Sequence, residues 1–219
     1  ETWRLLETAR LRFPNGGIAS NAGEAVRIAT RIGFPVAMKL SSYLIVHKTE
    51  VEGVHLNLKN EEDVRLAFQA ITNKLIEMGR LDAMQGVLIQ PMLAGGVEVM
   101  VGVTQDPLFG PLIAFGLGGI HVEILGDVSF RVTPLTDQDA SAMIKEIKGY
   151  RLLKGYRGHP AADIAKLEEM LLRVSRLVEA IPEITELDFN PVFAFAPGSG
   201  CTIADARVRL DHASPSLIS

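Results

Sequence analysis

Three apolar segments that follow one another without a helical pattern between them constrain the fold most. They span residues 97–103, 111–116 and 127–132, and the turn sequence DPLFG separates the first two. Each segment is short and contains β-branched or aromatic residues, which is typical of strands. Successive strands joined by turns pair antiparallel, so the sequence predicts an antiparallel sheet in the middle of the chain.

Helices and single strands alternate before this sheet. Asn21 and Glu24 form a capping pattern, and apolar residues then recur at helical spacing until Gly33. Pro91 stands near the end of a short apolar segment and indicates a sheet edge or a hinge. The predicted elements are helices over residues 21–33 and 60–79 and strands over residues 34–40, 54–58 and 86–92.

The rest of the chain predicts two further helices and a final hairpin. The elements are helices over residues 136–149 and 164–181 and strands over residues 186–195 and 202–210, which flank the turn PGSG. We therefore expect an α+β fold with an N-terminal lobe of residues 1–90 and a C-terminal lobe of residues 91–219. A cleft between the two lobes is the default position for a ligand.

Composition excludes several classes of protein. Hydrophobic residues make up 47% of the chain and charged residues 22%, which excludes wholesale disorder. The net charge of -4 and the aromatic content of 6% argue against a nucleic-acid partner.

No apolar run approaches the ~18 residues of a membrane span, and the N-terminal residues lack the pattern of a secretory signal. Cys201 is the single cysteine, so disulfide and thiolate-cluster chemistry are excluded. We expect a soluble cytoplasmic protein with no membrane partner.

Lys39 lies on a predicted strand whose neighbours are all apolar. An unpaired ammonium in such surroundings costs several kcal/mol, so an anionic partner is expected. The lysine is either at a sheet edge with its charged head in water or reaches into the cleft to a nucleotide phosphate. Both interpretations stay open on the strength of this residue alone.

His47 follows in a polar loop. Most loop histidines are exposed and have no role in chemistry. The functional alternative is a phosphate carrier, because imidazole is largely neutral near pH 7 and can accept a phosphoryl group.

Gly116, Gly118 and Gly119 lie close together, and such glycines let a backbone approach a phosphate. The third glycine of a dinucleotide fingerprint is missing, which disfavours a Rossmann fold. The alternative is a tight turn between strands.

Asp188 and Asn190 stand two residues apart on a predicted strand, so their side chains face the same side. Asp205 falls on the other strand of the hairpin, near Asn190. Oxygen ligands on paired strands suit Mg²⁺, which takes one or two carboxylates and completes its shell with nucleotide phosphates. The alternative is that these residues cap a turn.

Four ordered blocks carry a resemblance to a known family. They are MKLSSYLIVHKTEVEGVHLNL, VLIQPMLAGGVEVMVGVTQDPLFGP, FGLGGIHVEILGDVSFRVTPLT and ELDFNPVFAF. The chain resembles the ATP-grasp part of NDP-forming acyl-CoA synthetases, relatives of succinyl-CoA synthetase, and in particular the β subunits of ADP-forming acetate–CoA ligases. The resemblance covers residues 22–210 and implies an ATP-grasp fold in which two α+β lobes clamp a nucleotide.

The resemblance also implies roles for individual residues. Those near the nucleotide are Lys39 at the phosphates, Gln90, Pro91 and Met92 as the adenine-reading hinge, Glu98 at the ribose, and Gly118 and Gly119 over the phosphates. Asn190 and Asp205 would hold Mg²⁺, and Arg131 would be an added cation near the phosphates. His47 would pick up phosphate from a phosphohistidine of a partner domain and carry it to ADP.

The loop around His47 departs from the family pattern. Tyr43 and Leu44 take the places of Pro and Asp before the histidine, and Glu50 and Glu52 take those of Asp and a Gly after it. A lost glycine restricts φ and an added carboxylate repels phosphate. These changes bear on loop motion and phosphate relay more than on nucleotide binding.

The resemblance implies the reaction acyl-CoA + ADP + phosphate ⇌ carboxylate + CoA + ATP, with ATP/ADP and Mg²⁺ as cofactors. Partners would be an α subunit or domains that bind CoA and carry the main phosphohistidine, so the chain alone would not complete the reaction. The alternative is a catalytically decayed, ligand-responsive regulatory domain of a protein lysine acetyltransferase. A third possibility is an interaction module whose cleft has no function.

Overall fold

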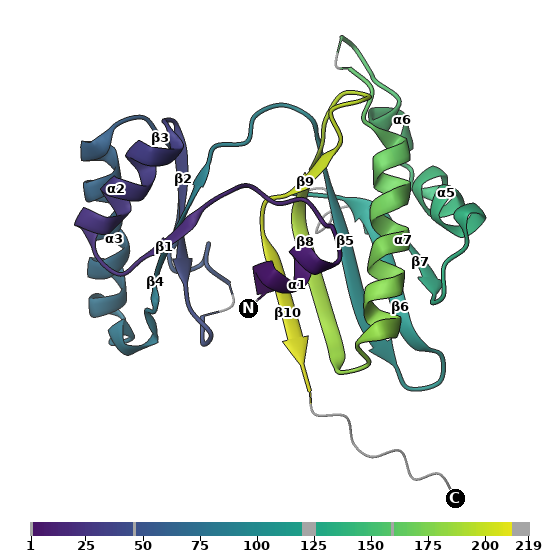
Figure 1. Cartoon of the computed structure of the whole chain (residues 1–219), viewed down its shortest axis with the longest axis horizontal. Coiled ribbons are helices and arrows are strands. Elements are labelled where there is room, and N and C mark those ends of the chain that lie inside the picture. The colour runs from purple at the N-terminus through teal and green to yellow at the C-terminus, as the bar shows by residue number, and fades with distance from the viewer. Residues whose placement is uncertain (1, 46, 120–125, 159, 212–219) are drawn as a thin grey trace, which may run out of the picture. The chain divides into compact units, whose positions relative to one another are not determined.

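The structure is a computed structural model that describes residues 2–45, 47–119, 126–158 and 160–211. The chain forms two compact units (Figure 1). The small unit is Pro14–Ala94, and the large unit combines Glu1–Phe13 with Gly95–Ser219. None of the described helices is long and apolar enough to cross a membrane.

The small unit is an antiparallel sheet with two helices on one face. Among its described residues the sheet has four strands in the order β1-β4-β2-β3. Its elements are β1 (Gly17–Ala19), α2 (Ala22–Ile32), β2 (Val36–Ser41), β3 (Val54–Leu58), α3 (Glu61–Glu77), the 3₁₀ turn η1 (Leu81–Ala83) and β4 (Gly86–Pro91). The two helices and three longer strands confirm the predictions, whereas β1 was not predicted.

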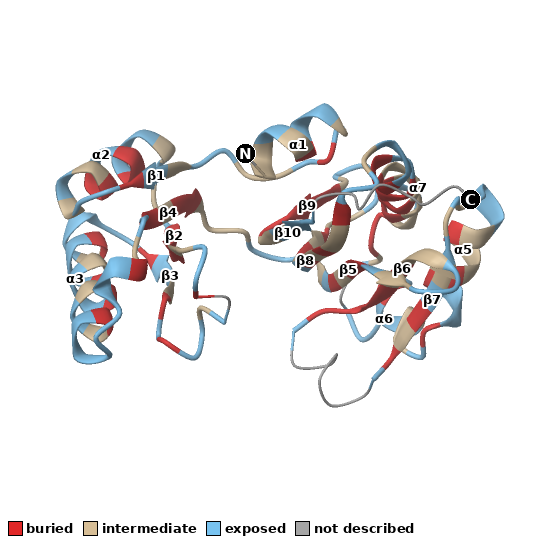
Figure 2. Ribbon diagram, turned by 90° about the horizontal axis from the view of Figure 1, so that it is seen from below, coloured by how far each residue is buried: buried red, intermediate tan, exposed pale blue. Residues whose placement is uncertain are grey.

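Alternation along β2 decides which side chains enter the core of the small unit. Val36, Met38 and Leu40 belong to the core cluster that also holds the buried side chains of α2 and α3. Figure 2 shows red segments on β2 and on both helices. Successive side chains of a strand point to opposite faces, so Ala37 and Lys39 lie on the face without helices.

Of the two expectations for Pro91, a sheet edge or a hinge, the sheet edge is wrong. β4 lies between β1 and β2 in the interior of the sheet. Proline is tolerated there because β1 pairs only with residues 87–89, so Pro91 lies two residues beyond the last paired position on that side. A missing N–H costs least at a strand end.

The large unit is an antiparallel sheet covered by helices on one face. Its described residues form six strands in the order β10-β8-β5-β6-β7, with β9 beside β8. Its elements are α1 (Thr2–Thr8), β5 (Val97–Asp106), β6 (Gly110–Leu117), β7 (Val128–Val132), α5 (Asp137–Glu146), α6 (Tyr150–Leu153), α7 (Ile164–Ala180), β8 (Ile184–Ala194), β9 (Cys201–Ile203) and β10 (Ala206–Leu210). The antiparallel pairing of β5, β6 and β7 confirms the first prediction.

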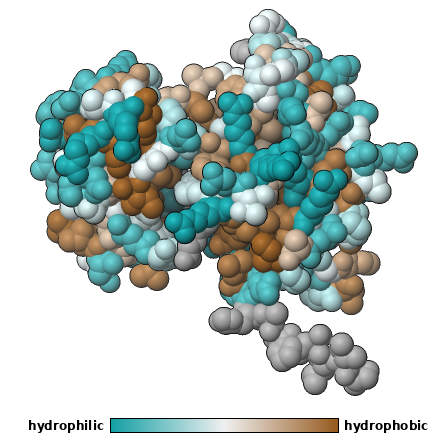
Figure 3. Space-filling view, in the orientation of Figure 1, coloured by the Kyte–Doolittle hydropathy of each residue, from teal (hydrophilic) through white to brown (hydrophobic). Residues whose placement is uncertain are grey.

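The core of the large unit lies between its sheet and α7. Val99, Val101 and Val103 of β5 are buried there, together with the predicted apolar stripe of α7. Glu98 alternates with these valines and therefore lies on the face without helices. Figure 3 shows hydrophilic side chains over the visible surface of both units, interspersed with hydrophobic ones.

The N-terminal helix α1 was not predicted, and the first thirteen residues were assigned to the first lobe. In the structure Leu6 is fully buried in the core of the large unit, and the Trp3 ring lies 4.7 Å from the Phe13 ring. The units therefore differ from the predicted lobes 1–90 and 91–219. The N-terminal segment is hydrogen-bonded to residues 163 and 187 positions further along the chain, a packing that no local pattern encodes.

Candidate functional site

Lys39 and Gln90 lie on the same face of the small unit's sheet. Ala37 pairs with Gln90 and Lys39 pairs with Leu88, so these side chains face away from the helices. Lys39 is only 8% exposed and Gln90 only 3%. β2 lies between β4 and β3, so the alternative of an edge lysine with its head in water is wrong. The face without helices thus holds a lysine and a glutamine that are both largely buried.

The predicted adenine-reading hinge, Gln90 to Met92, begins with Gln90 on this face of the sheet. Pro91 has no N–H, and the Met92 N–H donates to the Pro35 carbonyl at 3.0 Å. The last two residues of the segment therefore offer carbonyl oxygens rather than N–H donors, and carbonyl oxygens can accept from an amino group.

The loop after β2 holds His47 in an exposed position. Its base is fixed, because the Leu40 N–H donates to the Gly53 carbonyl and the Gly53 N–H donates to the Lys48 carbonyl, both at 2.7 Å. A Cβ on Gly53 would lie 2.9 Å from the Leu40 Cβ, so only glycine fits this base. The histidine is thus carried on a loop anchored to the strand of Lys39.

Glu52 occupies a backbone position that favours glycine. Its φ is 53°, in the left-handed region, where a side chain costs roughly 1 kcal/mol. Its carboxylate binds the Lys74 ammonium of α3 at 2.8 Å, and this hydrogen bond lowers the pKa of Glu52. The added negative charge is therefore neutralised within the small unit, which reduces the repulsion of phosphate that its presence suggested.

Glu98, Gly118 and Gly119 come together in the large unit. The Gly118 N–H donates to the Glu98 carbonyl at 2.8 Å, and a Cβ on Gly119 would lie 3.1 Å from the Glu98 Oε2. A Cβ on Gly118 would lie 3.1 Å from backbone atoms of Glu98 and Val99. Gly118 thus has a packing reason to be glycine that is independent of any phosphate. Residues 120–125 of the same predicted block lie outside the described residues.

Asn190 and Asp205 face each other across the hairpin. β8 pairs through Val192 with Ile203 and through Phe189 with Ala206, which leaves Asn190 opposite Asp205. The predicted single strand over residues 202–210 is therefore two strands, β9 and β10. They part where the Ala204 N–H donates to the Pro191 carbonyl at 2.9 Å.

Asp188 is the residue that sequence reasoning identified but did not assign to the site. It pairs with Gly102 of β5 and Arg207 of β10, and it alternates with the buried Leu187 and Phe189. Burial raises the pKa of Asp188, and the negative charge of Asp205 raises it further. The two carboxylates are therefore close enough to repel each other.

This donor set fits Mg²⁺. Asn190 and Asp205 supply oxygen ligands from opposite positions, and the nearby Asp188 adds negative charge that a divalent cation would neutralise. No cluster of three or more His, Cys, Asp or Glu side chains suited to a metal occurs among the described residues. Mg²⁺ is commonly bound by one or two protein carboxylates and keeps water and phosphate in the rest of its shell.

Arg131 does not join these residues. It pairs in register with Ile113, which is fully buried beneath the helices, and its guanidinium forms an ion pair with Glu146 of α5. Arg131 thus lies on the face that the helices cover, whereas Glu98 and Asp188 lie on the other face. The geometry argues against the predicted contact of Arg131 with phosphate.

Comparison with known proteins identifies the class. A family model described as an ATP-grasp domain matches residues 1–210, so the chain belongs to the ATP-grasp family. The β subunit of acetate–CoA ligase (ADP-forming) II from Pyrococcus furiosus is 45% identical over 211 residues, which cover 96% of this chain and 89% of that subunit. The 4-hydroxybutyrate–CoA ligase (ADP-forming) of Nitrosopumilus maritimus is 43% identical, and the chain spans 30% of its length.

Solved structures show the same architecture. The dinucleotide-forming acetyl-coenzyme A synthetase 1 of Ca. Korarchaeum cryptofilum, in complex with coenzyme A and Ca-AMPCP, matches with a TM-score of 0.90 and 41% identity over 96% of this chain and 90% of that one. A second structure of that synthetase, with Mg-AMPPCP and its phosphohistidine segment pointing towards the nucleotide-binding site, matches with a TM-score of 0.80 and 40% identity over 96% and 90% of the two chains. The predicted ATP-grasp fold is therefore confirmed.

Asp188→Asn is expected to stabilise the chain without Mg²⁺ at pH 7 by on the order of 1 kcal/mol, or ~2–4 °C in Tm. The pKa of Asp188 is raised in the folded state, so its charged form opposes folding. This penalty is absent below the ordinary value of 3.8 and complete above the raised folded value, so the advantage of the variant should grow as the pH rises through that window.

Thermal unfolding from pH 3.5 to 7 measures this effect, with the exposed Asp211→Asn as the control. A gain in Tm that does not change with pH would show that folding does not raise the pKa of Asp188.

Proposed function

We propose that this chain is the nucleotide-binding subunit or domain of an ADP-forming acyl-CoA synthetase. The reaction is acyl-CoA + ADP + phosphate ⇌ carboxylate + CoA + ATP. The observation that carries the proposal is the oxygen-donor set in which Asn190 lies opposite Asp205, in a chain 45% identical to a ligase β subunit. CoA binding and the main phosphohistidine belong to a partner subunit or to further domains, because the chain spans only 30% of a single-chain relative.

We assign the roles from the resemblance to the family, and the position of each residue within its own unit supports them. Lys39, buried on the sheet face without helices, binds phosphate oxygens through its ammonium. Glu98 accepts hydrogen bonds from the ribose, and the carbonyl oxygens of Pro91 and Met92 accept from the adenine amino group. Asn190 and Asp205 hold Mg²⁺, which neutralises charge on the phosphates when bound.

His47 carries the phosphoryl group from the partner's phosphohistidine to ADP. A ring nitrogen of His47 attacks the phosphorus of the partner's phosphohistidine, a new P–N bond forms, and the old P–N bond breaks with its electron pair left on the partner imidazole. A β-phosphate oxygen of ADP then attacks the same phosphorus, which forms the P–O bond of ATP and releases the imidazole of His47. The exposed loop position makes His47 accessible to a partner.

The alternative of an acetyltransferase regulatory domain has less support. The relatives described above are named as ligases. The presence of Glu52 in place of a family glycine favoured a domain that has lost phosphate relay. The ion pair of Glu52 with Lys74 accommodates this substitution.

Calorimetric titration of Mg-ATP and Mg-ADP into the full chain tests the proposal. Both nucleotides should bind, and chelation of Mg²⁺ should weaken both. Failure of both nucleotides to bind would overturn the assignment.

His47→Ala is expected to suppress phosphate exchange between nucleotide and partner by at least ~100-fold and to leave Mg-ATP affinity within about twofold. The reason is that relay needs the imidazole, whereas nucleotide binding needs Lys39 and the metal ligands. The measurement is transfer of labelled phosphate from ATP to the partner's histidine in the reconstituted assembly.

His55→Ala serves as the matched control, because His55 lies on β3 of the same unit and has no proposed role in the relay. Wild-type exchange by His47→Ala would remove the relay role and leave the nucleotide-binding proposal standing.

A further inference from the structure

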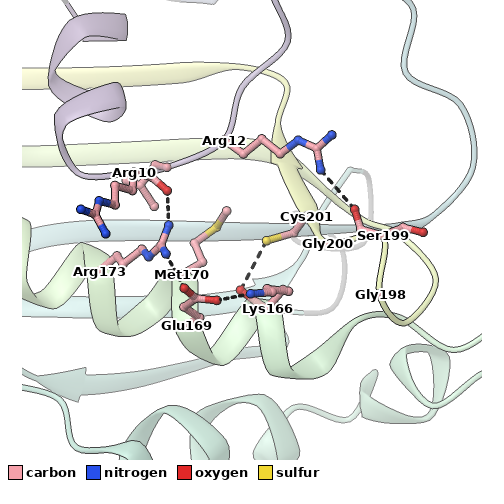
Figure 4. A pocket seen from close by; sticks show the side chains of 11 residues that line it. Arg10, Arg12, Lys166, Glu169, Met170, Arg173, Gly198, Ser199, Gly200 and Cys201 are labelled. Atoms are coloured by element: carbon pink, nitrogen blue, oxygen red, sulfur yellow. Dashed lines mark hydrogen bonds and ion pairs between the residues drawn. The ribbon is translucent and has the colours of Figure 1, made fainter.

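A cavity of about 340 Å³ lies within the large unit, apart from every residue assigned above to nucleotide or metal (Figure 4). Three segments distant in sequence form its wall: the chain after α1, one face of α7, and the turn before β9. The lining residues are Arg10, Leu11, Arg12, Lys166, Glu169, Met170, Arg173, Gly198, Ser199, Gly200 and Cys201.

The charges of this lining are strongly one-sided. Four cations, Arg10, Arg12, Lys166 and Arg173, face a single carboxylate, Glu169, in a chain whose net charge is -4. Burial raises the pKa of the Cys201 thiol to about 11, so the thiol is neutral and adds no negative charge. The lining side chains therefore carry an excess of three positive charges, which the carboxylate of Asp163 behind the glycine turn partly offsets.

Glu169 orders the two cations of α7. Its carboxylate binds the Lys166 ammonium, one helical turn before it, at 2.6 Å. It also binds the Arg173 guanidinium, one helical turn after it. Arg173 donates in addition to the carbonyl of Arg10, whose φ of 55° turns the chain at this point. These contacts fix the directions of the two side chains and offset only one of their charges.

Arg10 and Arg12 supply the remaining charge. Both are exposed, and no acid forms an ion pair with either guanidinium in the described part of the chain. Arg12 donates to the Ser199 carbonyl at 3.3 Å, which holds its guanidinium beside the glycine turn (Figure 4).

The backbone N–H groups of residues 198–200 in this turn are already hydrogen-bonded within the protein. The N–H groups of Gly198 and Gly200 donate to the same Asp163 oxygen at 2.9 Å and 3.0 Å, and the Asp163 side chain also caps the start of α7. The backbone donors are therefore already used, so the arginine and lysine side chains are the groups that remain to recognise an anion.

We propose that this cavity binds a phosphate-bearing small anion, of the size of a diphosphate. Guanidinium groups match phosphate oxygens in pairs, and a lining with three arginines and one lysine suits a multiply charged ligand better than a single carboxylate. The volume lies at the small end of ligand pockets and leaves room for a phosphate group and part of its carrier. The site is separate from the proposed nucleotide site and does not depend on it.

Pyrophosphate titration tests the proposal through a local signal. Met170 lines the cavity, whereas Met143 is fully buried in the core elsewhere in the same unit. In the full chain with ¹³C-methyl methionine, and with Lys39→Met present to weaken the nucleotide site, the Met170 resonance should shift and saturate. The Met143 resonance should stay unchanged.

The double variant Arg10→Asn, Arg12→Gln should weaken this binding by at least about tenfold, since each lost charged hydrogen bond is worth about that much. Asparagine tolerates the positive φ of position 10, so the fold is kept. Arg176→Gln, an exposed site on α7 outside the lining, should leave the affinity unchanged.

Two further ligands identify the source of the phosphate. If ADP shifts Met170 with the affinity of pyrophosphate, the ligand is a nucleotide diphosphate, and if only pyrophosphate does so, it is an inorganic phosphate. Either result supports the proposal. Absence of a saturable Met170 shift at millimolar pyrophosphate, wild-type affinity in the double variant, or tighter binding of polyglutamate than of pyrophosphate would overturn it.

Discussion

Lys39→Met is expected to weaken Mg-ATP binding by about 10- to 100-fold without unfolding the chain. Lys39 is 8% exposed on an interior strand, where a hydrogen bond from an ammonium to phosphate is worth ~1.5–3 kcal/mol. Methionine preserves the apolar stem of the side chain and removes only the charge. Because the substitution leaves the backbone pairing of β2 with β3 and β4 in place, the chain should stay folded. Calorimetry gives the affinity, and thermal unfolding gives the stability.

Lys59→Met is the matched control, because Lys59 is an exposed cation of the same unit. It should bind Mg-ATP as the wild type does. Equal affinity for the wild type and Lys39→Met would remove Lys39 from the nucleotide site and require another reason for a buried ammonium on this face.

Asp205→Asn is expected to weaken Mg-ATP binding by at least ~100-fold, because it removes the carboxylate from the two proposed protein ligands of Mg²⁺. This loss of affinity should disappear in excess chelator. Without the metal, Asp205 and the nearby Asp188 repel the phosphates, so the variant should bind free ATP as well as the wild type or slightly better. Titration of ATP with Mg²⁺ and with excess chelator measures the affinities for Mg-ATP and for free ATP.

Asp211→Asn, an exposed aspartate just after β10, controls for the loss of one negative charge. A loss of affinity in Asp205→Asn that is the same with and without Mg²⁺ would make Asp205 a structural residue. Asn190→Ala should then also lack any dependence on Mg²⁺.

Local sequence patterns determined the helix starts and most of the strands. The Asn21 side chain accepts from the Glu24 N–H at 2.9 Å, and Asn60 and Thr136 cap their helices in the same way. The predicted turn over DPLFG joins β5 to β6. These features depend on interactions within about four residues, which a sequence displays directly.

The sequence predicted the part of the candidate site that depends only on two positions opposite each other on paired strands. The hairpin spacing predicted that Asn190 and Asp205 would approach each other, and the register leaves them opposite. It did not predict that Asp188 would interact with Asp205, because that depends on how deeply the sheet buries each carboxylate. The wrong expectation for Arg131 has a similar cause: only the pairing of β7 with β6 decides which face a side chain takes.

The sequence by itself determined the local elements, the family and the residue types of the nucleotide site. The tertiary structure alone decided that Lys39 lies on an interior strand, that α1 packs with the large unit, and that three distant segments gather four cations around one cavity. The physical reason is range: capping and periodicity act within a turn or two, whereas strand order and burial result from many weak contacts between residues far apart in the chain.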